Sequence, residues 1–182
     1  MAGAALAARL PAAAIETAGT LTIEGQPMSW RTRSALESVG LHAPSHRSRQ
    51  ATAADLARAD LIVGLAPEHV EWVRREHPVA AGRTGTLKRL CRSPAPIIGP
   101  LQTWVAGLHL EQVSLEGWET VVDPGGGDEA AFVACAHEVV ELIDELALLL
   151  GATPGSAAEP DRRGTVELPD AEPELLDDER LA

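Results

Sequence analysis

The chain has 182 residues, enough for one domain with an appendage, and 45% of them are hydrophobic, which suffices for a packed core. Its formal net charge of −12 argues against non-specific binding to nucleic acid or to an anionic membrane, because both need a basic surface. The two cysteines are too few for a disulfide framework, and no Cys/His cluster has zinc-site spacing. No stretch approaches the roughly 20 apolar residues of a membrane helix. We therefore expect a cytoplasmic protein without a metal or cofactor.

The first forty residues predict two helices with a strand between them. Residues 2–10 predict a short helix, and residues 15–20 predict a short strand that ends in a glycine turn. Ser29 is a residue type that caps helices, and it is predicted to begin a helix that runs to about Val39. Gly40 follows at the position where a left-handed residue is favoured.

The middle of the chain continues the alternation. Thr52 is predicted to begin a short helix over residues 53–58. Residues 60–65 form a β-branched apolar run bounded by charge and proline, typical of a strand buried on both faces. Pro67 is predicted to lie in the first turn of the next helix. Residues 86–90 are interpreted as the last strand.

The second half predicts one long helix and a tail. Residues 91–122 indicate irregular or weakly helical structure, and a helix is predicted from Asp128 to about Leu150. The apolar positions of this helix recur every three or four residues: Phe132, Cys135, Val139, Ile143, Leu146 and Leu150. Residues 152–182 hold nine acidic residues against three arginines and have little apolar content, which predicts a disordered acidic tail. The expected division is therefore a folded domain over 1–151 and a tail over 152–182.

This order of elements predicts a fold class. Strands that alternate with helices imply right-handed crossovers and a parallel sheet with helices on both faces. The expected fold is therefore α/β with a doubly wound parallel sheet. The pattern starts with a helix that has no preceding strand, so we expect the first central strand to be missing from this sequence.

Five short motifs occur in an order that resembles one known family. They are Met1-Ala2-Gly3-Ala4, Thr17-Ala18-Gly19-Thr20 followed by Gly25-Gln26-Pro27 and Arg31, Gly40-Leu41 with Ser45-His46-x-x-Arg49-Gln50-x-Thr52, Asp60-Leu61-Ile62-Val63, and Val122-Asp123-Pro124. In this order they resemble the low-molecular-weight protein tyrosine phosphatases over about residues 1–150. That family begins with a strand and a Cys-x5-Arg-Ser-Pro phosphate loop, and Met1 to Ala4 resemble the start of the helix that follows the loop.

The resemblance implies roles for several residues. In the family a cysteine thiolate attacks phosphorus, and an aspartate protonates the departing oxygen and then activates water. Asp123, held by Pro124, matches that aspartate, whereas composition alone favours a plain surface turn here. His46 matches a histidine that supports the phosphate loop through a network that includes the hydroxyl of Thr17. Outside the resemblance, His46 would be an ordinary solvated side chain.

Two departures from the family pattern affect substrate and nucleophile. The family has an aromatic residue near positions 21–23 that walls the substrate pocket, whereas this chain has Leu21, Thr22 and Ile23, and Trp30 is its nearest aromatic. Cys91-Arg92-Ser93-Pro94 is similar to the end of the phosphate loop, but Ile97 stands where the arginine is needed, so we interpret this match as chance. Cys135, on the apolar face of the last helix, is expected to be a core residue.

Three interpretations of function remain open. The resemblance implies a phosphatase that acts on phosphotyrosine in a protein, or on a small phosphomonoester, with the 1–182 chain inactive because it lacks the nucleophile loop. A non-catalytic pseudophosphatase or binding remnant is the alternative. An arsenate reductase of the same fold ranks last, because neither cysteine has a resolving partner nearby. The oligomeric state and the role of the tail are left open.

Overall fold

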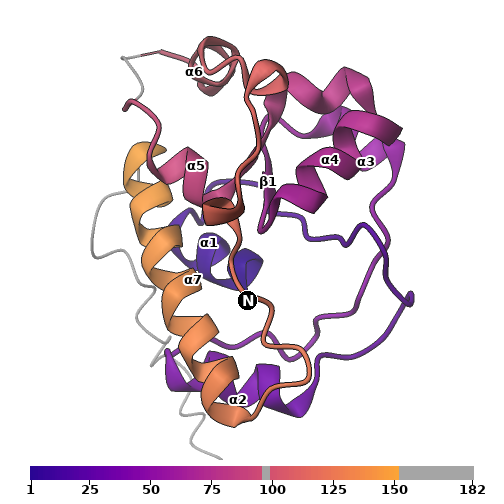
Figure 1. The fold of residues 1–182 in the computed structure, drawn as a ribbon. Helices are drawn as coiled ribbons and strands as arrows, with labels where there is room; N and C mark the ends of the chain where they lie inside the picture. Colours follow the sequence, from indigo (N-terminus) through magenta and orange to yellow (C-terminus); the bar gives the residue numbers. More distant parts are fainter. Residues whose placement is uncertain (96–98, 152–182) are drawn as a thin grey trace, which may run out of the picture.

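The computed structural model describes residues 1–95 and 99–151 (Figure 1). The elements are, in chain order, α1 (Ala2–Arg9), α2 (Trp30–Ser38), α3 (Ala53–Arg58), β1 (Ile62–Gly64), α4 (Pro67–Glu76), η1 (Pro78–Arg83), β2 (Thr84–Thr86), α5 (Leu87–Cys91), α6 (Leu101–Gly107), η2 (Leu110–Gln112), η3 (Gly117–Glu119) and α7 (Glu129–Leu149). In the described ranges, no helix is both long and apolar enough to cross a membrane. The expected tail at 152–182 lies outside the described residues.

The predicted helix starts are confirmed by their capping bonds. The Ser29 hydroxyl accepts a hydrogen bond from the backbone N–H of Thr32 at 3.1 Å. Thr52 and Asp55 form a reciprocal capping box at the start of α3. The Asp128 carboxylate accepts from the backbone N–H of Ala131 at 2.9 Å and caps α7. Short polar side chains satisfy amide groups that the first helical turn leaves free, which is why these positions begin helices.

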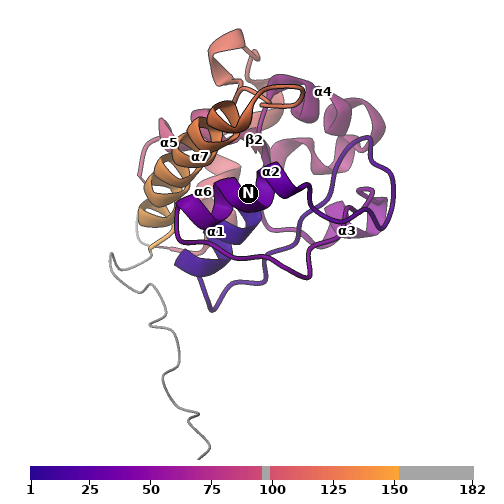
Figure 2. The ribbon, with the colours of Figure 1, turned by 90° about the horizontal axis from the view of Figure 1, so that it is seen from below.

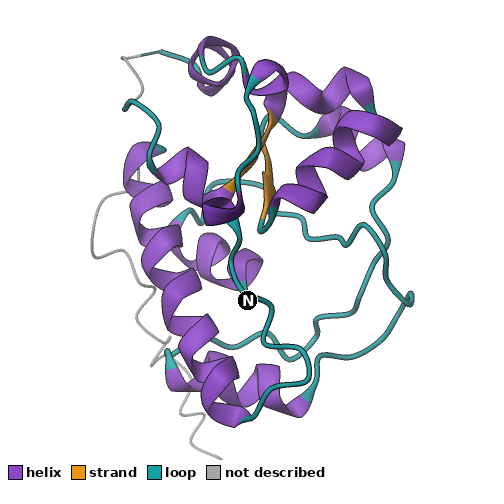
Figure 3. Ribbon diagram, in the orientation of Figure 1, coloured by secondary structure: helices purple, strands orange, loops and turns teal. Residues whose placement is uncertain are grey.

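The sheet is small and parallel, and helices lie on both sides of it (Figure 3). β1 pairs with β2 in the register that places Val63 opposite Gly85. Ile62 packs into a cluster with Leu56 and Val73 on the α3 and α4 side. Its neighbour Val63 packs into the larger core on the α1 and α7 side. Because successive strand side chains point to opposite faces, this alternation confirms the expected doubly covered α/β sheet.

Helix α7 organises the larger core. It packs along α1 and α2, as Figure 2 shows from below, and it also contacts α5. Val139, Ile143 and Leu146 are at most 1% exposed, and they lie on the face predicted from the three-to-four-residue spacing. Leu36 of α2 and Leu90 of α5 pack against the same core. The last helix of the domain therefore covers elements from its first forty residues.

The prediction of a strand at residues 86–90 is wrong. The strand occupies Thr84–Thr86, and the next residues form α5. The Thr86 hydroxyl accepts a hydrogen bond from the Arg89 backbone N–H at 3.3 Å, which caps the new helix. Leu87 and Leu90 are both 0% exposed, three residues apart on one helical face. The capping threonine and this spacing outweigh the weak strand signal of the segment.

The expected strand at residues 15–20 is not regular. Gly19 forms an isolated parallel bridge with Gln50, and its backbone exchanges hydrogen bonds with Arg49 and Ala51 at 2.9 Å. In the described part of the chain, no backbone hydrogen bond joins residues 15–20 to β1. A single bridge cannot sustain a ladder, so the segment stays extended without becoming a strand. The expected central strand beside it remains a prediction.

Candidate functional site

The start of α1 lies against the Thr17 turn. A side chain at Gly3 would place its Cβ 2.1 Å from the Cγ2 methyl of Thr17, closer than atoms can approach. Gly3 therefore lets the turn pack directly on the first helical turn. This contact places Thr17 beside the helix N-terminus, where free backbone N–H groups favour negative charge.

His46 lies on the segment that pairs with this turn. The segment is bridged to the Thr17 turn at Gly19 and Gln50, and to the following loop at Pro27 and Arg47. The His46 side chain is half-buried, and its backbone N–H donates to the Ala43 carbonyl at 3.2 Å. Among the described residues, no hydrogen bond joins the His46 and Thr17 side chains. The supporting role of His46 therefore stays a prediction.

Asp123 lies in a tight turn between η3 and α7. Its carboxylate accepts a hydrogen bond from the Gly125 N–H at 2.9 Å, and the Gly127 N–H donates to the Pro124 carbonyl at 2.8 Å. Gly126 has a φ of 81°, which favours glycine. A Cβ at Gly127 would lie 2.9 Å from the Pro124 carbonyl oxygen. The glycine run thus folds this loop back and leaves the Asp123 carboxylate exposed to solvent.

Cys135 links this turn to the start of α1. Burial is the main cause that raises the pKa of the Cys135 thiol, with smaller contributions from the charges of Glu138 and Asp123. The amino group of Met1 acts on the same thiol in the opposite direction. The Asp123 carboxylate and the Met1 amino group therefore both lie close enough to Cys135 for their charges to act on the same thiol. Cys135 packs against the larger core as predicted.

Trp30 begins α2 and is 61% exposed. The guanidinium of Arg31 lies 5.0 Å from the centroid of its ring. Further along α2, the Ser34 hydroxyl donates to the Glu129 carboxylate at 2.8 Å, which ties this helix to the start of α7. Leu21 and Ile23 are 93% and 70% exposed, so an aliphatic surface stands where the family pattern has an aromatic one.

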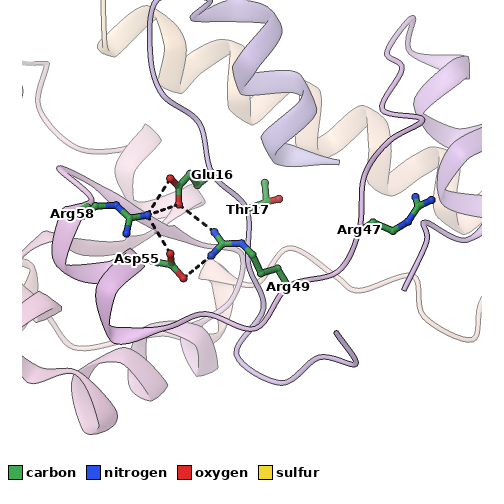
Figure 4. A pocket seen from close by; sticks show the side chains of 6 residues that line it. All are labelled: Glu16, Thr17, Arg47, Arg49, Asp55 and Arg58. Carbon is green, nitrogen blue, oxygen red and sulfur yellow. Dashed lines mark hydrogen bonds and ion pairs between the residues drawn. The ribbon is translucent and has the colours of Figure 1, made fainter. Parts of the chain in front are cut away.

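An open groove of about 410 Å³ begins at Thr17 and is lined by charged side chains (Figure 4). Arg49 pairs with Glu16 at 3.2 Å and with Asp55 at 2.6 Å. Arg58 pairs with the same two carboxylates at 3.2 Å each. Arg47 also lines the groove but points away from this network. The hydrogen bond from Thr52 above all, with help from Arg49, lowers the pKa of Asp55 to about 2.

This ion-pair network was not predicted from the sequence. We call its members, Glu16, Arg49, Asp55 and Arg58, the charged network. Two arginines within six residues of Asp55 were a possible signal, but nothing in the sequence brings Glu16 to them. The network joins the Thr17 turn to α3; the side chains of Glu16 and Arg58 are exposed, whereas those of Arg49 and Asp55 are partly buried.

Cys91 lies in the last turn of α5, not at a helix start. Its thiol donates to the Leu142 carbonyl at 3.2 Å. Burial, followed by the charge of Glu145, raises the pKa of this thiol to about 11. A reactive thiolate needs a low pKa and a positive environment, so this geometry agrees with the interpretation of the Cys91 motif as chance.

The described ranges contain no group of three or more His, Cys, Asp or Glu side chains arranged to hold a metal ion. What the arrangement offers is a helix start packed on a hydroxyl-bearing turn, with an exposed carboxylate on a separate loop nearby. The fold is that of an α/β domain, and the start of its first described helix packs on the Thr17 turn.

Comparisons with known proteins identify the family. Residues 1–95 match the family model described as "Low molecular weight phosphotyrosine protein phosphatase". The match spans more than half of the chain, which therefore belongs to this family. No curated protein matches the sequence.

Solved structures agree with this assignment. The YwlE arginine phosphatase from Geobacillus stearothermophilus is 25% identical, with 82% of each chain covered and a TM-score of 0.64. A low molecular weight protein tyrosine phosphatase from T. tengcongensis is also 25% identical, with 80% of this chain and 86% of that chain covered and a TM-score of 0.60. The tyrosine phosphatase Wzb from Escherichia coli K30 is 20% identical, covers 82% of this chain and 87% of its own, and has a TM-score of 0.65. At that identity it shows the fold alone.

Proposed function

We propose that this domain serves the hydrolysis of phosphomonoesters, with phosphotyrosine in proteins as the substrate of the family form and Asp123 as the proton donor. The observation that carries the proposal is the exposed Asp123 carboxylate, which a turn of glycines fixes and whose charge acts on the same Cys135 thiol as the amino group of Met1. In the first step a thiolate bonds to phosphorus and the bond to the leaving oxygen breaks, while Asp123 gives that oxygen its proton. In the second step water attacks the phosphorus of the cysteinyl-phosphate, the S–P bond breaks to release the thiolate and inorganic phosphate, and the Asp123 carboxylate takes the proton from the water.

We propose that residues 1–182 do not perform this reaction by themselves. The first step needs a thiolate and an arginine six residues later, and neither cysteine of the sequence meets this spacing. The sixth residue after Cys91 is Ile97, and the sixth after Cys135 is Glu141. Both thiols also have raised pKa values, mainly because they are buried. The pseudophosphatase interpretation has the same support, and an arsenate reductase stays the weakest candidate.

The decisive experiment compares two polypeptides with p-nitrophenyl phosphate as substrate. The first is the 1–182 chain, for which we expect no hydrolysis above background. The second carries a strand and a Cys-x5-Arg-Ser-Pro loop placed directly before Met1, for which we expect turnover. In the second polypeptide Asp123→Asn should lower kcat by about 100-fold or more, the usual contribution of a general acid. Rapid hydrolysis by 1–182 that Cys91→Ser abolishes would overturn the proposal, and so would an Asp123→Asn variant with unchanged kcat.

The substrate side chain is a separate question within the same assay. One of the similar structures is an arginine phosphatase and another a tyrosine phosphatase, both at 25% identity. The aliphatic side chains of Leu21 and Ile23 give an aromatic ring little to stack on, and Trp30 is the nearest aromatic residue along the sequence. Parallel measurements with phosphotyrosine and phosphoarginine peptides therefore decide the specificity. If Trp30 walls the pocket, Trp30→Ala should raise KM for the phosphotyrosine peptide more than for the phosphoarginine peptide.

A further inference from the structure

A buried carboxylate stands four residues before Asp123. Glu119 is 0% exposed, although it is charged and lies in a short 3-10 turn between two irregular segments. Its oxygens accept hydrogen bonds from the Arg89 guanidinium, the Thr86 hydroxyl and the Glu116 backbone N–H, the last at 2.8 Å. A buried charge is stable only with partners of this kind, so the site is built around this one side chain.

The partners of Glu119 come from the carboxyl end of the sheet. Thr86 is the last residue of β2, and Arg89 lies one turn into α5. The guanidinium of Arg89 approaches the carboxylate with two nitrogens, and its Nη2 also donates to the Ser114 carbonyl at 2.8 Å. We call Thr86, Arg89 and Glu119 the buried anchor. Because the strand end at Thr86 and the helix start at Leu87 are both fully buried, the anchor holds the backbone at residue 119 against the core.

Two further bonds hold the residues that follow. The Lys88 ammonium donates to the Thr120 carbonyl at 2.7 Å. The Val121 N–H donates to the Leu65 carbonyl at 2.8 Å, just beyond the end of β1. Trp118 is covered by Arg92, whose guanidinium lies 4.0 Å from the ring centroid. Each of residues 118–121 therefore makes a hydrogen bond or a cation–π contact with the rest of the domain. Val122, the next residue, is 68% exposed.

The role of the buried anchor follows from these contacts, and it rests on the proposed function of Asp123. We infer that Thr86, Arg89 and Glu119 position the Asp123 carboxylate by fixing the backbone that leads to it on the ends of β1 and β2. Glu119 is thus a positioning residue that touches no substrate. A general acid must stand within hydrogen-bond reach of the oxygen that it protonates, and an error of about 1 Å is costly.

The chemistry of Glu119 is consistent with a permanent anchor. Burial alone would raise its pKa, but the hydrogen bonds from Arg89, Thr86 and Glu116 outweigh burial and hold the pKa below its usual value. The other charges near it are Arg89 and Glu116, whose carboxylate lies 3.8 Å from the guanidinium of Arg89. Glu119 thus stays ionised at neutral pH and does not act as a switch.

The test uses nuclear magnetic resonance on the full 1–182 chain and needs no activity. The Gly125 N–H donates to the Asp123 carboxylate, so its chemical shift follows the ionisation of Asp123 as the pH changes. The Gly127 N–H closes the turn onto Pro124, so its exchange with solvent reports the order of the loop. In Glu119→Gln we expect the pH-dependent shift of Gly125 to lose at least half its amplitude. We expect exchange at Gly127 to rise by about tenfold, the equivalent of losing one such hydrogen bond.

Matched variants separate positioning from general destabilisation. Arg9→Gln removes an ion pair between α1 and α7, Arg9 to Asp144 at 2.6 Å, that lies outside this loop. It should leave the Gly125 titration unchanged even if it lowers the melting temperature. Thr86→Ser keeps the hydroxyl and should behave as the wild type, whereas Thr86→Val should reproduce part of the Glu119→Gln effect. This pair keeps the test valid if Glu119→Gln fails to fold.

Two outcomes would overturn the inference. One is a Glu119→Gln or Thr86→Val variant with an unchanged Gly125 titration. The other is faster exchange at Gly127 that merely matches the change at core amides of α7 such as Ile143. The result is independent of the phosphatase assay. An Asp123→Asn variant with unchanged kcat would reject the proposed function, but the Gly125 shift and the Gly127 exchange rate would still show whether the anchor orders the loop.

Discussion

The Thr17 turn and the segment before Asp123 are held in different ways. The Thr17 turn is paired with residues 49–51 and joined to α3 by the charged network, which lies at the surface with Glu16 and Arg58 exposed and Asp55 partly buried. The segment before Asp123 is held by the buried anchor, with Glu119 removed from solvent. Exposed ion pairs contribute little and are screened by salt, whereas a buried pair resists salt and fails badly when one partner is lost. The two sides of the site should therefore respond differently to the same kinds of change.

The largest effect is expected from Arg89→Ala. It leaves the Glu119 carboxylate buried without its main partner, which typically costs about 3–5 kcal/mol of unfolding free energy. Urea unfolding at pH 7 measures the loss of unfolding free energy. Replacing both partners, as in Arg89→Met with Glu119→Leu, should restore much of the loss because no unpaired charge remains. A double variant as unstable as Arg89→Ala would show that packing, and not charge, dominates at this position.

A second test concerns the partly buried thiol of Cys91. With a pKa of about 11, Cys91 should form roughly 100-fold less thiolate at neutral pH than an ordinary cysteine. Alkylation of the folded protein by iodoacetamide should therefore be slow at Cys91, and mass spectrometry of the labelled peptides measures it. Addition of urea should bring the rate to that of a free thiol. Fast labelling of Cys91 in the folded state would contradict its burial against Leu142.

The turn that carries Asp123 ends at Asp128, the N-cap of α7, where a substitution should have a smaller effect on stability. Asp128→Ala removes the acceptor for the Ala131 N–H and should lower the unfolding free energy by about 1 kcal/mol. Asp128→Ser retains an acceptor and should restore most of the loss. Thermal melts of the three proteins measure the difference. A loss equal in both variants would mean that negative charge at the helix start matters more than the hydrogen bond.

The smallest effects belong to the charged network. Asp55 has a pKa of about 2, below its value in an unfolded chain, so the stability it contributes is present above about pH 4. This stability is lost as the pH falls from about 4 to 2. In Asp55→Asn the free energy of unfolding should change less between pH 4 and pH 2 than in the wild type. At pH 7, 1 M salt should reduce the loss of unfolding free energy caused by Arg49→Gln. If the loss of unfolding free energy in Arg49→Gln does not depend on salt, the charged network and the buried anchor do not differ in the way we expect.

The sequence allowed the helices to be predicted better than the sheet. Capping residues such as Ser29, Thr52 and Asp128 act on their immediate neighbours, so a local pattern identifies them. Strand pairing depends on which distant segments lie side by side. That is why residues 15–20 were expected to form a strand and make only one bridge at Gly19. The same limit explains the error at residues 86–90, where Thr86 ends a strand and begins a helix.

The candidate site was predictable only in part. Asp123 was identified through its place in a family pattern, because a glycine-rich turn alone has no specific signal. Glu119 was not identified: its partners Thr86 and Arg89 lie about 30 residues away, and nothing near Glu119 in the sequence indicates that it is buried. Long-range polar contacts of this kind arise from the packing of the whole domain, which local patterns do not encode.

The packing of α7 on α1 and α2 has a consequence for biogenesis. The ion pair between Arg9 and Asp144 joins residues 135 positions apart, and the apolar faces of the first two helices are buried by a helix near the other end of the domain. Contacts so distant in sequence make folding slow, because a long loop must close before they form. On the ribosome, the first forty residues cannot complete their core until residues 129–149 have emerged. Until then, the apolar faces of α1 and α2 should stay exposed to solvent in the nascent chain.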